Sequence, residues 1–199
     1  YEPSEGRILI DGHDLRTIPQ EALRARLAVA FQDYNQYQVS ARENVGFGDP
    51  AHLGDDARIT AAVHQGGAAE IVAGLPAGLG TQLGRWFDGG VELSGGQWQR
   101  IALARTFMRS EADIVVLDEP TAALDIDAEG EVFTRVRELA AGRTLLLISH
   151  RFANVRLADR IVVLAASGVV EQGDHAALMA ADGLYAAMFR KQASGYALG

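Results

Sequence analysis

The chain has 199 residues, of which 48% are hydrophobic and 22% are charged, as is typical of a folded globular protein. The absence of cysteine excludes a disulfide framework, cysteine-bound zinc and thiol catalysis. The formal net charge of −8 makes the chain a poor non-specific binder of nucleic acid or of an anionic membrane surface.

Hydrophobic periodicity predicts short strands and helices in the first half of the chain. The expected elements, in chain order, are a strand and turn at 6–12, a short helix at 19–27, a buried strand at 28–31, a polar and aromatic loop at 32–38, a helix at 59–72 broken by Gly66-Gly67, a glycine-rich loop at 74–90 and a helix at 97–108. No internal repeat or interdomain linker interrupts this order, so we expect a single domain over 1–199.

In the second half, strands alternate with helices, which indicates an α/β architecture. The expected elements are a strand at 114–117, a helix at 127–140, a strand at 144–148, a hairpin of 160–164 with 168–171, and helical structure from 175 onward. Residues 114–117 are a continuous apolar run, which is typical of a strand covered on both faces in a parallel sheet, and we expect 144–148 to be a second buried strand.

The segment Ser94-Gly95-Gly96-Gln97 directly precedes the helix expected at 97–108. Ser94 and Gln97 have the spacing of a capping box, in which each side chain accepts a hydrogen bond from the other residue's backbone. The two glycines leave backbone N–H groups unobstructed at the positive end of the helix dipole, so the segment suits a phosphate group. Taken alone, the pattern fits a plain capped helix equally well.

Three further polar positions follow predicted strands. Asp118 and Glu119 end the strand at 114–117, His150 follows the strand at 144–148, and Gln32 follows the strand at 28–31. Ligands of open α/β sheets bind beyond the carboxyl ends of strands, where one carboxylate can hold Mg²⁺ and the other can polarise water. Each position alone also fits a solvated turn acid, a structural histidine or an ordinary loop glutamine.

The order and spacing of these segments resemble those of the ATP-binding cassette (ABC) family. The resemblance is carried by Leu-Ser-Gly-Gly-Gln-Trp-Gln-Arg at 93–100, Asp-Glu-Pro-Thr-Ala-Ala-Leu-Asp at 118–125 and Ile-Ser-His-Arg at 148–151. It implies an α/β fold with a P-loop NTPase-like ATPase core, a mostly parallel sheet and a helical subdomain inserted at about 34–110. It also implies ATP and Mg²⁺ as cofactors.

The resemblance further implies a role for each site residue. Ser94, Gly95, Gly96 and Gln97 form the signature motif, which contacts ATP held by the opposite subunit, and Asp125 lies in the D-loop between the two sites. Asp118 and Gln32 are the metal ligands, and Glu119 is the general base. His150 is the switch histidine, and Gln32 also relays closure to the membrane partner.

Two flanking regions, 41–45 with Gly48 and 168–175 with 183–185, resemble the exporter branch of the family. They imply a domain at the cytoplasmic face of the cell membrane that powers transport by ATP hydrolysis. Its partners would be a transmembrane domain and a second, identical or related nucleotide-binding domain paired head to tail, with no nucleic acid partner. The loop at 84–90 is longer than its exporter counterpart and lacks a glutamate, and Pro120 stands where exporters often have alanine.

A phosphate-binding loop requires a lysine followed by serine or threonine. The only lysine is Lys191, which precedes Gln192, so the 199 residues contain no such loop. We expect a domain that lacks its first tens of residues and is inactive alone. One alternative is a naturally loop-less protein that supplies its signature motif to a partner. A second is a soluble ABC ATPase of DNA repair or translation, which usually carries coiled-coil insertions or basic surfaces.

Overall fold

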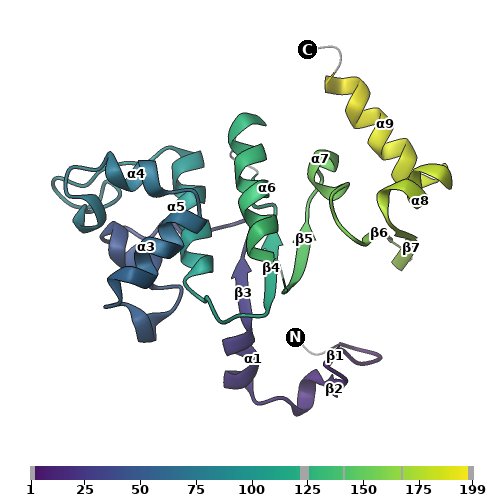
Figure 1. Cartoon of the computed structure of the whole chain (residues 1–199), viewed down its shortest axis with the longest axis horizontal. Coiled ribbons are helices and arrows are strands. Elements are labelled where there is room, and N and C mark those ends of the chain that lie inside the picture. The colour runs from purple at the N-terminus through teal and green to yellow at the C-terminus, as the bar shows by residue number, and fades with distance from the viewer. Residues whose placement is uncertain (1–2, 122–125, 141, 167, 197–199) are drawn as a thin grey trace. The chain divides into compact units, whose positions relative to one another are not determined.

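The computed structural model describes residues 3–121, 126–140, 142–166 and 168–196. These residues form two compact units, one over 1–146 and one over 147–199, and each is described by itself. The mixture of helices with a parallel strand pair confirms the predicted α/β class (Figure 1). The predicted single domain with a helical subdomain at about 34–110 stays a prediction. No helix of the described residues is long and apolar enough to cross a membrane.

The elements of the first unit follow the predicted order. They are β1 (Leu9–Ile10), β2 (His13–Asp14), α1 (Gln20–Arg26), β3 (Leu27–Ala30), α2 (Ala41–Gly46), α3 (Asp56–Gln65), α4 (Ala69–Ala73), α5 (Gly95–Phe107), β4 (Ile114–Asp118), α6 (Ile126–Ala140) and β5 (Thr144–Ile148), the last of which runs into the second unit. Short 3₁₀ turns occupy Leu15–Thr17, Pro50–His52 and Gly78–Gly80.

The strands β3, β4 and β5 form a sheet in that order, and β3 runs parallel to β4 with Ala30 opposite Leu117. The prediction that 144–148 is a buried strand was wrong, because Leu146 and Ile148 are 54% and 48% exposed. Their side chains point to one face of β5, which the described residues leave open, and an apolar run does not reveal which faces are covered. Phe31, expected in a buried strand, is 68% exposed because it lies past the last paired residue.

A hydrophobic core joins α2, α3, α4 and α5. Its buried members include Val45, Ile59, Trp98, Ile101 and Met108. The predicted break at Gly66-Gly67 is confirmed, since α3 ends at Gln65 and α4 begins at Ala69. Gly66 lies so close to the backbone of Ala104 that a Cβ atom there would collide with α5. The glycine therefore permits the close approach of the two helices as well as ending α3.

The second unit contains α7 (Phe152–Val155), β6 (Ile161–Ala165), β7 (Gly168–Gly173), α8 (His175–Ala180) and α9 (Leu184–Tyr196). The strands β6 and β7 pair antiparallel, which confirms the predicted hairpin, and a register shift falls between Val163 and Leu164. The two C-terminal helices confirm the helical structure expected from 175. A small core of Ile161, Leu178 and Tyr185 holds the helices against the hairpin.

Candidate nucleotide site

Helix α5 begins with the predicted capping box. The Ser94 Oγ accepts a hydrogen bond from the Gln97 N–H at 3.3 Å, and the Gln97 Oε1 accepts one from the Ser94 N–H at 2.9 Å. Among the described residues, no acceptor contacts the N–H of Gly95 or Gly96. These two N–H donors lie with the exposed Ser94 at the start of a 13-residue helix. Since the N–H groups and the positive end of the helix dipole attract negative charge, this end of α5 is suited to an anion.

The start of α5 is tied to the loop that follows β3. The Tyr34 hydroxyl donates a hydrogen bond of 2.9 Å to the carbonyl oxygen of Gly95. Burial raises the pKa of Tyr34, so its hydroxyl keeps the proton for this bond at neutral pH. Gln32 lies exposed in the same loop, two residues before Tyr34.

The carboxyl ends of β3 and β4 bring Gln32 and the two acidic residues to one edge of the sheet. Because Ala30 is paired with Leu117, Gln32 and Glu119 each lie two residues beyond the last registered pair. Asp118 ends β4, and both carboxylate residues are half-buried. The parallel pairing therefore places a neutral amide and two acids beyond adjacent strand ends, as the sequence suggested.

Glu119 adopts a left-handed backbone conformation with φ of 48°. Such a conformation costs roughly 1–3 kcal/mol for a residue other than glycine and is common at functional sites. The side-chain amide of Gln99, a buried residue of α5, donates a hydrogen bond of 3.3 Å to the Glu119 carbonyl oxygen. This role of Gln99 was not predicted from the sequence, where Gln99 is one of three polar residues, with Gln97 and Arg100, in the first turns of the helix.

The residues present fit Mg²⁺ bound to a nucleotide better than a metal bound by protein alone. The part of the chain that the structure describes contains no group of three or more histidine, cysteine or acidic side chains that could hold a metal. Mg²⁺ commonly takes one or two protein ligands and completes its shell with phosphate oxygens and water. Asp118 and Gln32 match that pattern, whereas Asp125 lies outside the described residues.

His150 belongs to the second unit, so its position is described within that unit alone. It is exposed and follows β5 by two residues, as predicted. Its backbone carbonyl accepts a hydrogen bond of 3.0 Å from the side-chain amide of Gln192 in α9. Gln192 lies 42 residues away along the chain, and none of the sequence motifs includes it.

A depression of about 270 Å³ opens beside β3 and α5 in the first unit. Its walls combine aromatic and cationic side chains, contributed by Phe31, Tyr34, Tyr37, Phe47, Arg105 and Arg109. Three of these aromatic residues, Phe31, Tyr34 and Tyr37, come from the segment directly after β3, where the sequence predicted a polar and aromatic loop at 32–38.

Arg105 fixes one wall of this depression. Its guanidinium donates to the carbonyl oxygens of Asn44 at 2.8 Å and Asn35 at 3.1 Å, and also bonds to the buried Asn44 side chain. The guanidinium carbon lies 4.4 Å from the centre of the Tyr37 ring. Burial lowers the pKa of Arg105 to about 10, which still leaves the group charged at neutral pH. The wall thus has a half-buried positive charge held by neutral groups.

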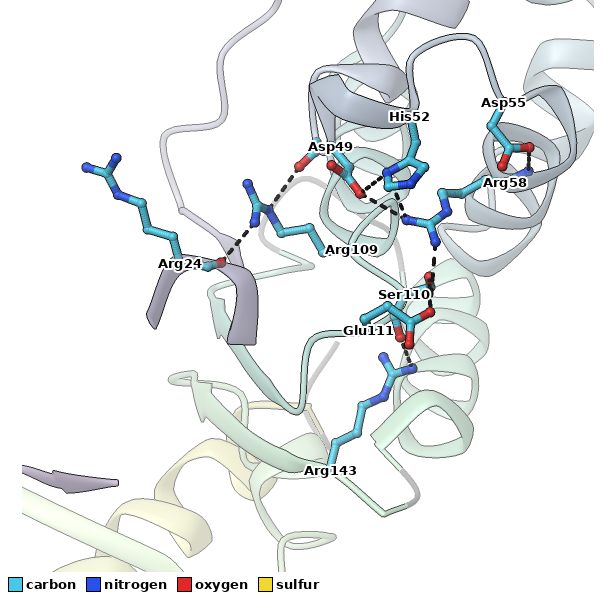
Figure 2. Close-up of polar contacts among 10 residues, drawn as sticks. Arg24, Asp49, His52, Asp55, Arg58, Arg109, Ser110, Glu111 and Arg143 are labelled. Atoms are coloured by element: carbon cyan, nitrogen blue, oxygen red, sulfur yellow. Dashed lines mark hydrogen bonds and ion pairs between the residues drawn. The ribbon is translucent and has the colours of Figure 1, made fainter. Parts of the chain in front are cut away.

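The neighbouring arginines tie this region to the rest of the first unit (Figure 2). Arg109 donates to the Gly48 carbonyl at 3.0 Å and to the Arg24 carbonyl at 2.9 Å, which joins α1 to the segment after α2. Arg58 bonds to Asp49 at 2.9 Å. Each of these contacts links segments of the helical part to one another or to α1, so we assign them a structural role.

Comparison with known proteins identifies the family. Residues 1–122 match the model of the ABC transporter family. The chain is 41% identical over 192 residues to an uncharacterised ABC transporter ATP-binding protein of Bacillus subtilis strain 168, which covers 96% of the chain and 32% of that protein. It is also 41% identical over 193 residues to an ATP-dependent lipid A-core flippase of Cupriavidus pinatubonensis, again over 96% of the chain and 32% of the relative.

A solved structure gives the same result. The fold matches a bacterial Atm1-family ABC exporter with ATP bound, with a TM-score of 0.87 and 37% identity over 97% of the chain and 33% of that protein. The chain therefore spans about a third of the length of these relatives. The chain belongs to the ABC transporter family.

Proposed function

We propose that these residues bind and hydrolyse ATP to power an exporter, together with a phosphate-binding loop that the 199 residues do not contain. The observation that carries the proposal is the arrangement around α5. This helix presents the N–H groups of Gly95 and Gly96 at its start. About one turn further along, Gln99 donates a hydrogen bond to the Glu119 carbonyl oxygen. One rigid element thereby serves an anion site and the predicted base.

The signature residues act on ATP held by a second nucleotide-binding domain. The Ser94 hydroxyl and the N–H groups of Gly95 and Gly96 bind its phosphate oxygens, while Gln97 keeps these donors in place through the capping box. The exposure of Ser94 supports this assignment because a partner domain can reach it. We infer that two such domains pair head to tail and that Asp125, which lies outside the described residues, links the two sites.

The residues beyond the strand ends act on the chain's own side of the site. Asp118 and Gln32 hold Mg²⁺, which when bound neutralises phosphate charge. Glu119 accepts the proton of the attacking water, and its position just beyond the carboxyl end of β4 supports this role. His150 donates a hydrogen bond to the terminal phosphate group and so stabilises the charge that develops there.

The depression lined by Tyr34, Tyr37, Phe47 and Arg105 receives a segment of the transporter's transmembrane domain. Its aromatic walls suit the apolar side of such a segment, and Arg105 and Arg109 suit its acidic or carbonyl groups. Since Gln32 lies directly beside Phe31, an occupant of the depression contacts the same loop as the proposed metal ligand. We infer that the domain lies at the cytoplasmic face of the membrane, where it would contact such a segment.

Glu119→Gln in the protein as its gene encodes it tests the proposal. We expect ATP turnover to fall at least a hundredfold, because the amide cannot accept the proton, while MgATP binding persists. The matched control is Glu111→Gln, which changes an exposed acid in the loop before β4. Turnover of Glu119→Gln equal to that of the control would show that Glu119 is not the base.

A further inference from the structure

One face of α9 packs against the loop that carries His150. Tyr185, Phe189 and Gln192 follow one another at helical spacings of four and three residues, so they share that face. The Phe152 ring lies 5.4 Å from the Tyr185 ring and 5.9 Å from the Phe189 ring, measured between centroids. The apolar contacts therefore bring the end of α9 beside residues 150–152.

Gln192 bonds to the backbone on both sides of Arg151. Its Nε2 donates to the His150 carbonyl oxygen at 3.0 Å, and its Oε1 accepts from the Phe152 N–H at 2.8 Å. A single planar amide thus satisfies an acceptor and a donor two residues apart. Both bonds reach main-chain atoms, so they restrict the backbone from which the His150 side chain projects.

The other end of α9 is held independently, which makes the helix a firm support. The Glu171 carboxylate accepts hydrogen bonds from the N–H groups of Leu184 and Tyr185, the latter at 2.9 Å. The Tyr185 hydroxyl lies 2.9 Å from the Nδ1 of His175 in α8. Because the first turn of α9 is bonded to β7 and α8, rotation of the helix would break these bonds, and Gln192 stays directed at the loop.

We propose that Gln192 is a positioning residue for His150. It holds the backbone of 150–152 in the conformation from which the imidazole can reach a terminal phosphate group, and it does not itself contact the nucleotide. This inference rests on the role of His150 under the proposed function. It assigns a part in ATP hydrolysis to helix α9, which lies outside the three segments at 93–100, 118–125 and 148–151 that carry the family resemblance.

The test compares Gln192→Leu with Arg190→Gln in the protein as its gene encodes it. Leucine keeps the approximate volume and removes both hydrogen bonds. Arg190→Gln, on the same helix as Gln192, removes only an exposed ion pair with Asp182, which lies just before α9 begins. We expect Gln192→Leu to lower kcat about tenfold with KM for MgATP changed less than twofold. Hydrogen exchange at the Phe152 amide should accelerate about tenfold, since its acceptor is gone. Arg190→Gln should change neither quantity.

Three results overturn the inference: unchanged exchange at Phe152, unchanged kcat, or a kcat loss that is matched by Arg190→Gln. The inference would also be overturned if Gln192→Leu lowered the melting temperature more than Arg190→Gln does and raised KM as well. Such a pattern indicates general destabilisation. His150→Ala, measured in parallel, separates the two proposals. Full turnover of that variant would refute the role of His150 under the proposed function, whereas the exchange rate at Phe152 would still report whether Gln192 holds the loop.

Discussion

Two helices of the first unit begin with the same capping box, and only one of them belongs to the proposed nucleotide site. Ser40 caps α2 with Glu43 as its partner, and Ser94 caps α5 with Gln97. Loss of an N-cap serine side chain costs about 1 kcal/mol. Ser40→Ala removes the hydroxyl bond to the Glu43 carboxylate at 2.6 Å as well, so its cost should equal or exceed that of Ser94→Ala.

The two variants therefore separate stability from function. We expect both to lower the melting temperature by roughly 2–4 °C, which corresponds to about 1 kcal/mol in a unit of this size. We expect Ser94→Ala alone to lower ATP turnover, by about a hundredfold, because a donor to the reacting phosphate is lost. Thermal unfolding and initial-rate ATPase measurements on the same preparations decide the matter. Equal turnover in both variants would refute the nucleotide role of Ser94 and leave it a plain helix cap.

Two further predictions concern packing around α5. Arg105→Met leaves the carbonyl groups of its partners without a donor, so it should cost about 3 kcal/mol and roughly 6–12 °C in melting temperature. The control Arg42→Met breaks one exposed ion pair and should cost at most about 1 kcal/mol. Similar losses of stability in the two variants would contradict the value expected for Arg105→Met. Gly66→Ala should lower the free energy of unfolding by about 1–3 kcal/mol, because the added Cβ meets the α5 backbone. The control is Gly54→Ala, whose Cβ would enter open space. Equal denaturant midpoints for the two variants would show that α3 can move away from α5.

Local features of the fold could be predicted from the sequence because they depend on residues a few positions apart. The capping box of Ser94 and Gln97 spans four residues, and both of its bonds are present. The β6–β7 hairpin and the break at Gly66-Gly67 are equally local. The likeness of 93–100, 118–125 and 148–151 to the ABC family predicts how distant segments are arranged. The family match and the similar relatives confirm the family itself.

The parts that could not be predicted depend on contacts between distant residues. The bond from Gln99 to Glu119 spans 20 residues, and the bond from Gln192 to His150 spans 42. No pattern of residue types reveals which backbone carbonyl a glutamine will reach. The prediction that Leu146 is buried was wrong for a related reason. An apolar run indicates a strand but not whether both faces of that strand are covered.

The helix α5 contacts both the depression and the proposed nucleotide site, so a change in one can affect the other without direct contact between them. Its start accepts the Tyr34 hydroxyl, its second turn holds Glu119 through Gln99, and its last turn carries Arg105, which bonds to Asn35. Ten residues of helix separate the first contact from the last, a rise of about 15 Å. Tyr34 and Asn35 are neighbours in the loop after β3, so loop and helix brace each other at two points. A displacement of that loop by an occupant of the depression would therefore have to shift the helix or break one of the two bonds, and a shift of the helix moves Gln99 together with it.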